Sequence, residues 1–482
     1  MRVRRTAGAA GQALAPHIEA ILERSDTPLR ASEDAVREAL DSDAEADPEH
    51  VVDPRGDATD IPFVTVDPVG ARDLDQALHL ERVRAGFRLR YAIADVAAHV
   101  VPGGALDALA HARGATVYCP DRRIGLHPPE MSEAHASLLP GQRTKAVLWT
   151  VDIDRDGEIG QVSLERTWVR SRRQLAYRDL GTSASAEDAE LRDILGEVGS
   201  ARRAAVRRQG GVTLPLPEQE VTSHDGRLHL ELRAGSRAED DNAHLSLATG
   251  MAGARLMMAG GTGVLRTMPA ASEEALATLR RQARALGVAW SDHASYGEVL
   301  SELDPQEASS LAFLTAATRL FRGARWEAFD RDAGQPLPDP PIHGALGAPY
   351  AHVTAPLRRL VDRYATEAAL ARSLSRPVSA WARDGLERAA QDTAAGTSRA
   401  NDVERRCIDA LESLVLSSRV GETFEGVALD DRTVQLTQPP VVARCDGEVP
   451  PGETVRVRVT RAAPPDGPEF ALAGQARDTS RP

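Results

Sequence analysis

The pattern of apolar and polar residues predicts a chain in which strands and helices are mixed. Segments with period-two alternation or short β-branched runs are typical of strands, and apolar residues spaced by three or four positions are typical of helices. The predicted strands are 61–67, 77–83, 87–96 and a hairpin over 146–169. The predicted helices are 242–258, 272–287 and 380–418. The pattern therefore predicts an α+β protein, and its 482 residues are too many for a single ordinary core.

The first 60 residues have a different character from the rest of the chain. Two short helical patterns are present, and Ser32 is placed to cap the second of them. An acidic linker follows within 42–50. We expect residues 1–60 to form a small helical domain with this linker, and a helix-turn-helix unit is a weakly supported alternative.

The last part of the chain, 419–482, is again rich in strands. In 454–461 three valines alternate with two arginines, so that one face is apolar and the other is basic. This pattern predicts a small antiparallel barrel of the OB type, whose arginines would be available for phosphates. A β-domain without a ligand is an equally acceptable interpretation of the pattern alone.

Composition narrows the class of protein. No apolar run approaches the roughly 18 residues that a membrane helix needs, and no secretory signal is recognisable, so we expect a soluble cytoplasmic protein. The three cysteines are far apart and predict neither a disulfide framework nor a zinc site. The net charge is −13, but residues 1–60 carry 14 acidic residues against 7 arginines and hold about half of it. The acidic total therefore does not exclude a nucleic-acid partner.

A group of carboxylates follows the first predicted strand of the central region. Asp67 ends that strand, and Asp73 and Asp75 alternate with Leu74, so the last two carboxylates project to one side of an extended backbone. Without a counter-charge such a group is unfavourable, because like charges repel and raise each other's pKa. Mg²⁺ prefers carboxylate oxygens and keeps positions open for phosphates. The group predicts a metal site, although helix caps and surface ion pairs remain an alternative.

A second candidate site lies in 352–370. Thr354 is placed to cap a helix and Pro356 is tolerated in a first turn, which would put Arg358 and Arg359 at a helix start. Free amides and the helix dipole favour anions there, and arginines bind phosphate well. The segment predicts a phosphate clamp, with two solvated arginines as the alternative.

A basic stretch lies between these two candidate sites. Without further context a solvated surface is the better interpretation of such a charge run. Its arginines are Arg166, Arg170, Arg172, Arg173, Arg178, Arg202, Arg203, Arg207 and Arg208.

Taken together, four ordered motifs resemble the ribonuclease II/ribonuclease R family of 3′-to-5′ exoribonucleases. They are DPVGARDLDQA with YAIADVAAHV, TVYCPDRRIGLHPPEMSEAHASLLPG, VRSRRQLAY, and IHGALGAPYAHVTAPLRRLVD. The resemblance implies an RNB-type mixed α/β catalytic domain over 61–418 and an S1-like barrel over 419–482. It also implies Mg²⁺-dependent, processive hydrolysis of single-stranded RNA to nucleoside 5′-monophosphates, without an organic cofactor. We expect the protein to act as a monomer.

Individual positions take roles from the same resemblance. Asp67, Asp73 and Asp75 fall on the magnesium-binding aspartates, and Arg358 falls on the catalytic arginine; these four are the expected catalytic residues. The expected RNA-binding residues are Tyr177, Arg172, Arg173, Arg359 and Glu404.

The chain also departs from the pattern that it resembles. Gln76 stands where the family usually has a fourth aspartate, and a neutral amide is a poorer Mg²⁺ ligand. The 60 residues before the central region are too few for the family's two N-terminal cold-shock barrels, so we expect the C-terminal barrel and the N-terminal unit to capture RNA. These departures motivate an alternative function, an RNA-binding regulator of the same family that cuts poorly.

Overall fold

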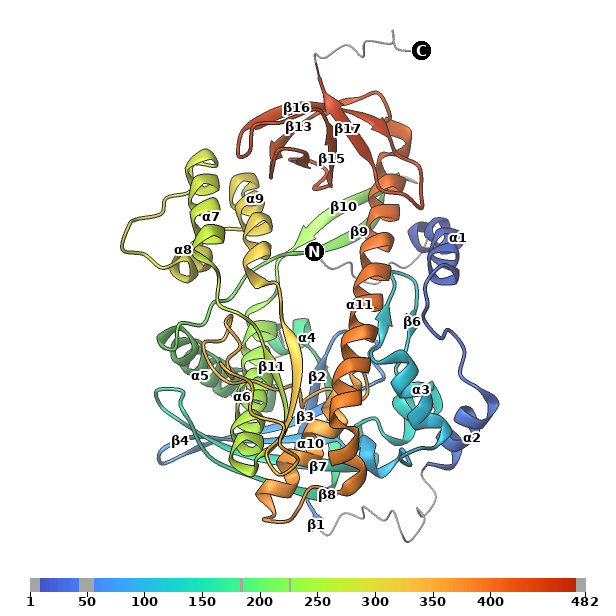
Figure 1. Ribbon diagram of the computed structural model, residues 1–482, viewed down its shortest axis with the longest axis vertical. Helices are drawn as coiled ribbons and strands as arrows, with labels where there is room; N and C mark the ends of the chain where they lie inside the picture. Colours follow the sequence, from blue (N-terminus) through green and yellow to red (C-terminus); the bar gives the residue numbers. More distant parts are fainter. Residues whose placement is uncertain (1–8, 43–55, 183–184, 225–226, 474–482) are drawn as a thin grey trace.

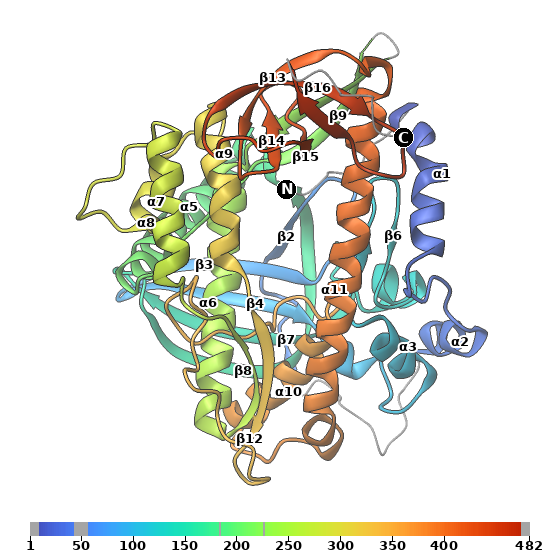
Figure 2. The ribbon, with the colours of Figure 1, turned by 45° about the horizontal axis from the view of Figure 1, so that its top comes forward.

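The computed structural model describes residues 9–42, 56–182, 185–224 and 227–473. A mixed sheet lies in one half of the molecule and a closed five-stranded barrel lies at the opposite end (Figure 1). The long helix α11 (Ala380–Leu416) runs from the sheet towards the barrel, as both ribbon views show (Figure 2). The α+β architecture with a C-terminal barrel is therefore confirmed.

The mixed sheet has six strands in the order β1-β8-β2-β3-β4-β7. Its long strand β8 pairs antiparallel with β7 along its first part and parallel with β2 along its last part. This switch places Ala176, the last residue of β8, opposite Asp67, the last residue of β2. The strands are β1 (Gly56–Asp57), β2 (Phe63–Asp67), β3 (Gln76–Val83), β4 (Gly86–Ala94), β7 (Arg143–Asp154) and β8 (Ile159–Ala176).

Helices pack around this sheet and bury a large apolar core. Tyr91, Trp149 and Val361 are fully buried in it, which joins β4, β7 and the helix after the second candidate site. The helices besides α11 are α1 (Ala9–Glu23), α2 (Glu33–Asp41), α3 (Ala105–Arg113), α4 (Tyr177–Thr182), α5 (Ala186–Arg208), α6 (Arg237–Gly260), α7 (Glu273–Ala285), α8 (Tyr296–Glu302), α9 (Ala308–Ala317) and α10 (Leu360–Ser373). Among the described residues, none of the helices is long and apolar enough to cross a bilayer.

The barrel confirms the alternation predicted for its arginine-bearing strand. Val457 and Val459 are fully buried, and Arg456 and Arg458 are exposed on the other face. The barrel strands are β13 (Thr423–Ala428), β14 (Thr433–Leu436), β15 (Val442–Asp446), β16 (Thr454–Arg461) and β17 (Glu469–Leu472). Three two-stranded ribbons complete the described strands: β5 (Val117–Tyr118) with β6 (Arg123–Ile124), β9 (Glu218–His224) with β10 (Arg227–Arg233), and β11 (Thr262–Thr267) with β12 (Arg325–Asp330).

The two N-terminal helices form at the predicted places, and the Ser32 hydroxyl caps α2 by accepting from the Ala35 amide. They belong to different cores. Leu14 and Ile18 of α1 pack with α11 and the barrel, whereas Ala35 and Ala39 of α2 pack with α3. Among the described residues, α1 and α2 therefore do not share a core, as a helix-turn-helix unit would require. Most of the predicted acidic linker lies outside the described residues, and the boundaries at 60 and 418 stay predictions.

A buried carboxyl group joins α11 to the barrel. Glu412 accepts a hydrogen bond of 3.0 Å from the Gln219 amide, which also donates to the Pro440 carbonyl of the barrel at 3.2 Å. Glu412 is 2% exposed. Burial raises the pKa of Glu412 to about 8, against the opposing effect of the Gln219 hydrogen bond. Neutral Glu412 is therefore the form that suits this junction.

This raised pKa predicts a dependence of stability on pH. Between the unfolded and folded pKa values the native state holds the extra proton, so the free energy of unfolding decreases as pH rises from about 5 to 9. We expect Glu412→Gln to remove at least about 1 kcal/mol of this decrease, since one pKa unit corresponds to about 1.4 kcal/mol. Urea unfolding at both pH values measures the effect, and the exposed Glu422→Gln is the control. Equal pH dependence in Glu412→Gln and the parent protein would contradict the assignment.

Candidate active site

The acidic segment after β2 is held by buried neighbours. The Leu74 side chain is fully buried in a small core with Phe63 and Leu138. The Leu74 amide donates to the Ser137 hydroxyl at 2.9 Å, and the Leu74 carbonyl accepts from the Leu138 amide at 3.0 Å. Because Leu74 points into the core, Asp73 and Asp75 on either side of it project away from that core, as predicted.

Asp75 links the acidic segment to the second candidate site, 282 residues further along the chain. Its Oδ1 accepts from the Leu357 amide at 2.8 Å, and its Oδ2 lies 3.4 Å from Arg358 Nε. Burial raises the pKa of the Asp75 carboxyl to about 8, although Arg358 and the Leu357 amide oppose the shift. The site therefore contains a carboxylate that needs more positive charge than Arg358 supplies.

Asp67 lies in the same electrostatic environment. Its Oδ2 is buried without a hydrogen-bond partner. Burial raises the pKa of Asp67 to about 7, and the charge of Asp73 raises it further while Arg358 lowers it. Asp73 also raises the pKa of Asp75. Asp73 and Arg358 thus each act on both Asp67 and Asp75.

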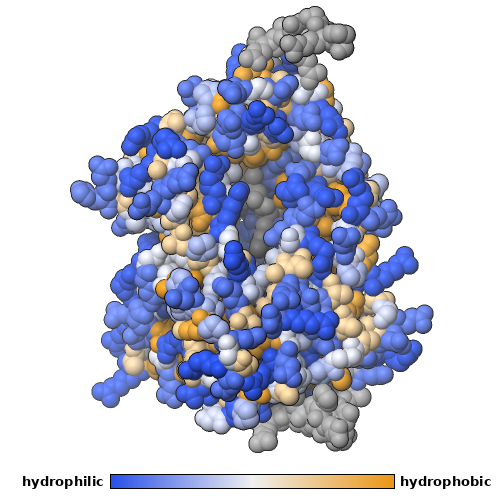
Figure 3. Space-filling model, viewed as in Figure 1, coloured by the Kyte–Doolittle hydropathy of each residue, from blue (hydrophilic) through white to orange (hydrophobic). Residues whose placement is uncertain are grey.

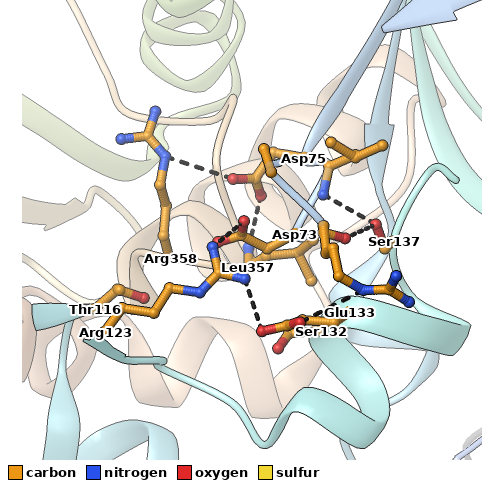
Figure 4. Close-up of polar contacts among 12 residues, drawn as sticks. Asp73, Asp75, Thr116, Arg123, Ser132, Glu133, Ser137, Leu357 and Arg358 are labelled. Carbon is orange, nitrogen blue, oxygen red and sulfur yellow. Dashed lines mark hydrogen bonds and ion pairs between the residues drawn. The ribbon is translucent and has the colours of Figure 1, made fainter. Parts of the chain in front are cut away.

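Asp73 has a different partner, however. Its carboxylate is bound by the Arg123 guanidinium, which also binds Glu133 at 2.7 Å. Figure 4 shows Asp73 turned towards Arg123 while Asp75 faces Leu357 and Arg358. Among the described residues, no group of three His, Cys, Asp or Glu side chains is arranged to hold a metal ion. The predicted three-carboxylate metal site is thus not seen as a ready-made cluster, and the metal roles stay a prediction.

The segment before α10 corrects a detail of the sequence analysis. The predicted helix start at Thr354 is wrong, because α10 begins only at Leu360 and 355–359 form a turn. The backbone groups of this turn have tertiary partners instead: the Ala355 amide donates to Asp362 at 2.8 Å, and the Arg358 carbonyl accepts from the Thr116 amide at 3.0 Å. The arginines therefore do not lie in the first turn of a helix.

The two arginines of this turn differ in environment. The Arg358 side chain is 38% exposed and forms an ion pair with the Asp75 carboxylate. Arg359 is mostly buried and donates twice to Asp362, at 2.9 and 2.8 Å. Burial opposes the charge of Arg359, but Asp362 more than offsets this and raises the pKa of Arg359. Arg358 is placed to meet a ligand, whereas the expected role of Arg359 in RNA binding gains no support from this geometry.

Gln76 is fixed by hydrogen bonds at both ends of its amide. Its Nε2 donates to the Thr354 carbonyl at 2.6 Å, and its Oε1 accepts from the Tyr91 hydroxyl. Gln76 therefore ties the start of β3 to the segment that carries Arg358.

The end of β8 brings Tyr177 to the site. Tyr177 follows Ala176, whose partner across the sheet is Asp67, and its hydroxyl accepts from Asn242 Nδ2 at 2.9 Å. Burial raises the pKa of Tyr177 to about 12, with a contribution from the Asp67 charge. Arg358 also acts on it. The structure thus places Tyr177 near Asp67 and Arg358, and its role in RNA binding stays a prediction.

The other expected RNA-binding residues lie further away or are engaged. Arg172 donates to the Asp60 carbonyl at 2.8 Å, and Arg173 forms an ion pair with Asp188 at 2.8 Å. Glu404 lies on α11. A hydrogen bond with Cys119 is the main cause of the raised pKa of the Cys407 thiol, and the charge of Glu404 contributes to it. These roles stay predictions.

The basic stretch on α5 is mostly neutralised inside the protein. Arg202 is buried, Arg203 binds Asp241, and Arg208 pairs with Glu158 at 2.9 Å. Arg207 is exposed. The stretch therefore supplies no continuous basic surface for a nucleic acid.

Two residues near the site were not singled out from the sequence. The Tyr118 side chain is 46% exposed, and Asp73, Asp75 and Arg358 all act on its hydroxyl. Arg123 lies directly across the β5–β6 ribbon from it. Both residues are positioned by this short ribbon, whose strands have only two residues each and show no strand pattern in the sequence. The available signal was the need of the acidic group for a positive side chain, but the sequence does not show that Arg123 supplies it.

The residues present fit a divalent cation. Asp67 has a buried oxygen without a hydrogen-bond partner. Burial destabilises the charged forms of Asp67 and Asp75, and a nearby positive charge would stabilise them. Carboxylate oxygens are the ligands that hard divalent cations prefer. An arginine beside such carboxylates, together with an OB-type barrel, is typical of enzymes that act on phosphate esters.

Comparison with known proteins assigns the chain to a family. The RNB domain family matches residues 55–370, and the RNase II-type exonuclease C-terminal S1 domain matches residues 422–469. The chain belongs to the RNB family. It is 32% identical over 145 residues to exoribonuclease 2 of Psychromonas ingrahamii, a match that covers 29% of this chain and 22% of the relative.

Two longer matches agree with this assignment. The chain is 27% identical over 329 residues to exoribonuclease 2 of Vibrio cholerae, covering 64% of this chain and 47% of the relative, so it spans about half the length of that protein or less in these matches. The fold is similar to that of Mycoplasma genitalium RNase R in complex with ribose-methylated single-stranded RNA, with a TM-score of 0.81 and 19% identity. That match covers 95% of this chain and 78% of the other.

The locking of the acidic segment can be tested through Ser137. Its hydroxyl accepts from the Leu74 amide and donates to the Arg72 carbonyl at 2.5 Å. We expect Ser137→Ala to lower the free energy of unfolding by about 1–3 kcal/mol, because the buried Leu74 amide and the partly buried Arg72 carbonyl lose their partner. Chemical denaturation measures the change. The exposed Ser417→Ala, which loses one hydroxyl bond at a helix end, is the control and should change stability by less than about 0.5 kcal/mol.

Proposed function

We propose that the protein is a 3′-to-5′ exoribonuclease that hydrolyses single-stranded RNA processively to nucleoside 5′-monophosphates with Mg²⁺. The observation that carries the proposal is the 3.4 Å approach of Arg358 to Asp75 in a chain of the RNB family. It joins an acidic group and an exposed guanidinium from distant segments, which is what hydrolysis of a phosphodiester requires.

Arg358 is the group that would meet the scissile phosphate. Its guanidinium is more than a third exposed and is not committed to a short, two-pronged ion pair, unlike Arg359. Such a guanidinium can donate two hydrogen bonds to non-bridging oxygens and stabilise the charge that builds on them. Asp75 fixes the other side of the guanidinium, and the Leu357 amide fixes Asp75.

Asp67 and Asp75 are the residues that would hold the metal ion. When bound, a divalent cation there would activate a water molecule and stabilise the leaving oxygen. The protein's own contribution is to bury both carboxylates, so that each of them favours a nearby positive charge.

Aromatic rings and the barrel would hold the RNA strand. Tyr118 and Tyr177 offer rings on which bases can stack, and exposed Arg456 and Arg458 can contact phosphates. A cleft of about 750 Å³ on the barrel side contains Arg432 and other arginines, but its acids outnumber them, so it is not a phosphate groove. In the space-filling view the face between barrel and sheet is hollowed and largely hydrophilic (Figure 3). A cytoplasmic, monomeric enzyme remains our expectation.

The alternative of an RNA-binding regulator is not favoured. Asp67, Asp75 and Arg358 are all present, and Arg358 acts electrostatically on both carboxylates. A protein that only binds RNA would not need an arginine opposed to two desolvated carboxylates.

Replacement of Asp75 tests the chemistry. We expect Asp75→Asn to lower the rate of cleavage by about 10²-fold or more while RNA still binds, because a metal ligand is lost and repulsion of phosphate is relieved. The measurement is shortening of 5′-labelled single-stranded RNA to a ladder or a short limit product with Mg²⁺, beside a filter-binding assay. Asp156→Asn, in an exposed hairpin turn, is the matched control. Full cleavage by Asp75→Asn, or intact RNA with the parent protein, would refute the proposal.

Replacement of Arg358 separates binding from turnover. We expect Arg358→Ala to lower kcat by about 10²–10³-fold and to change affinity for RNA much less, because the guanidinium acts where charge develops. Single-turnover and binding measurements on the same RNA give the two effects. The exposed Arg207→Ala is the control for loss of one positive charge. A loss of affinity with unchanged turnover would show that Arg358 only anchors the strand.

A further inference from the structure

The Arg123 guanidinium forms a bridge between two carboxylates beside the candidate site. One amino group binds Asp73 and the other binds Glu133 Oε1 at 2.7 Å (Figure 4). The Asp73 side chain is only 14% exposed, so solvent screens this pair less than a surface pair. Arg123 thus neutralises Asp73 within the protein itself.

The position of Arg123 is fixed by the same backbone that fixes Arg358. Arg123 pairs with Tyr118 across the β5–β6 ribbon. Just before this ribbon, Ala115 forms a bridge with Arg359, and the Thr116 amide donates to the Arg358 carbonyl at 3.0 Å. The ribbon therefore places Arg123 on one side of the acidic group and holds the Arg358 turn on the other.

The remaining side chains leave two candidate ligands. Gln76 has its amide engaged by Thr354 and Tyr91. Asp73 faces Arg123. Asp67 retains an oxygen without a hydrogen-bond partner, and Asp75 Oδ2 has Arg358 at 3.4 Å. These are the oxygens that a cation could reach without breaking a short ion pair.

We infer that Arg123 takes the place of a second metal ion at Asp73, so that the centre binds one divalent cation, through Asp67 and Asp75. This inference rests on the proposed function, because that function supplies the cation. Arg123 is a positioning residue: it keeps Asp73 in place and compensates its charge, and a second cation at Asp73 would be repelled by the guanidinium.

Metal titration without RNA tests the inference. Isothermal titration of the full-length, metal-free protein with Mn²⁺ should give one site per chain. Arg123→Met should gain a second Mn²⁺ site or bind Mn²⁺ at least tenfold more tightly, because a nearby positive charge is removed. Arg123→Lys keeps the charge and should restore the behaviour of the parent protein, which a purely structural role of the guanidinium would not predict. A parent protein with two sites, or no change in Arg123→Met, would overturn the inference.

Three further variants make the result specific. Asp73→Asn should keep one Mn²⁺ site per chain and lose less affinity than Asp75→Asn, which should bind at least tenfold more weakly. Equal losses in both would overturn the inference. Arg122→Met removes the neighbouring arginine, which precedes β6 and pairs with Asp121 and Glu19 instead; it is the matched control and should bind Mn²⁺ like the parent.

Melting curves with and without Mn²⁺ show whether each variant folds. If Arg123→Met does not fold, the Arg123→Lys and Asp73→Asn titrations decide the question. RNA cleavage is measured separately, so the two proposals fail in different ways. Cleavage with two Mn²⁺ sites overturns only the single-cation centre. One Mn²⁺ site without cleavage overturns the exoribonuclease, and cleavage without any Mn²⁺ binding to the RNA-free protein overturns only the single-cation centre.

Discussion

Negative charge held out of water is the constraint on which the site depends. Asp67 and Asp75 are desolvated enough for burial to raise both pKa values, and Asp73 adds a like charge to each. Such a group is stable only if positive charge or hydrogen-bond donors are brought to it. The fold supplies the Arg123 guanidinium from the β5–β6 ribbon on one side. On the other side it supplies the Leu357 amide and the Arg358 guanidinium, both from the turn before α10.

The positions of these compensating groups depend in turn on hydrogen bonds to the backbone. The Leu74 amide donates to the Ser137 hydroxyl, which fixes the acidic segment. The Asp362 carboxylate accepts from the Ala355 amide, which fixes the turn before α10. The β5–β6 ribbon bonds to that turn through Thr116. The site is therefore built where three segments share backbone hydrogen bonds, and the side chains that face it have little freedom to move apart.

The sequence predicts those features whose cause is local. Strands and helices with clear periodicity were recovered, and burial of Leu74 orients its two acidic neighbours as alternation requires. Features set by distant partners were not recovered. A cap residue and a proline suggest a helix start at Thr354, but tertiary acceptors and Asp362 compete for the same amides. Arg359 is a different case, because its partner Asp362 lies only three residues further along the chain and is compatible with both an internal ion pair and a phosphate clamp.

Gln76 and Arg123 both make the site less negative. Replacing a carboxylate by an amide removes one negative charge, and Arg123 cancels another. Four carboxylates (Asp67, Asp73, Asp75 and Glu133) with Arg123 and Arg358 then leave a formal charge of −2, since the exposed Arg72 is screened by solvent. One divalent cation brings this sum to zero, whereas two would leave an excess of positive charge in a site that burial already makes intolerant of net charge. By making the site less negative, Gln76 and Arg123 therefore limit the number of divalent cations that it can stably bind.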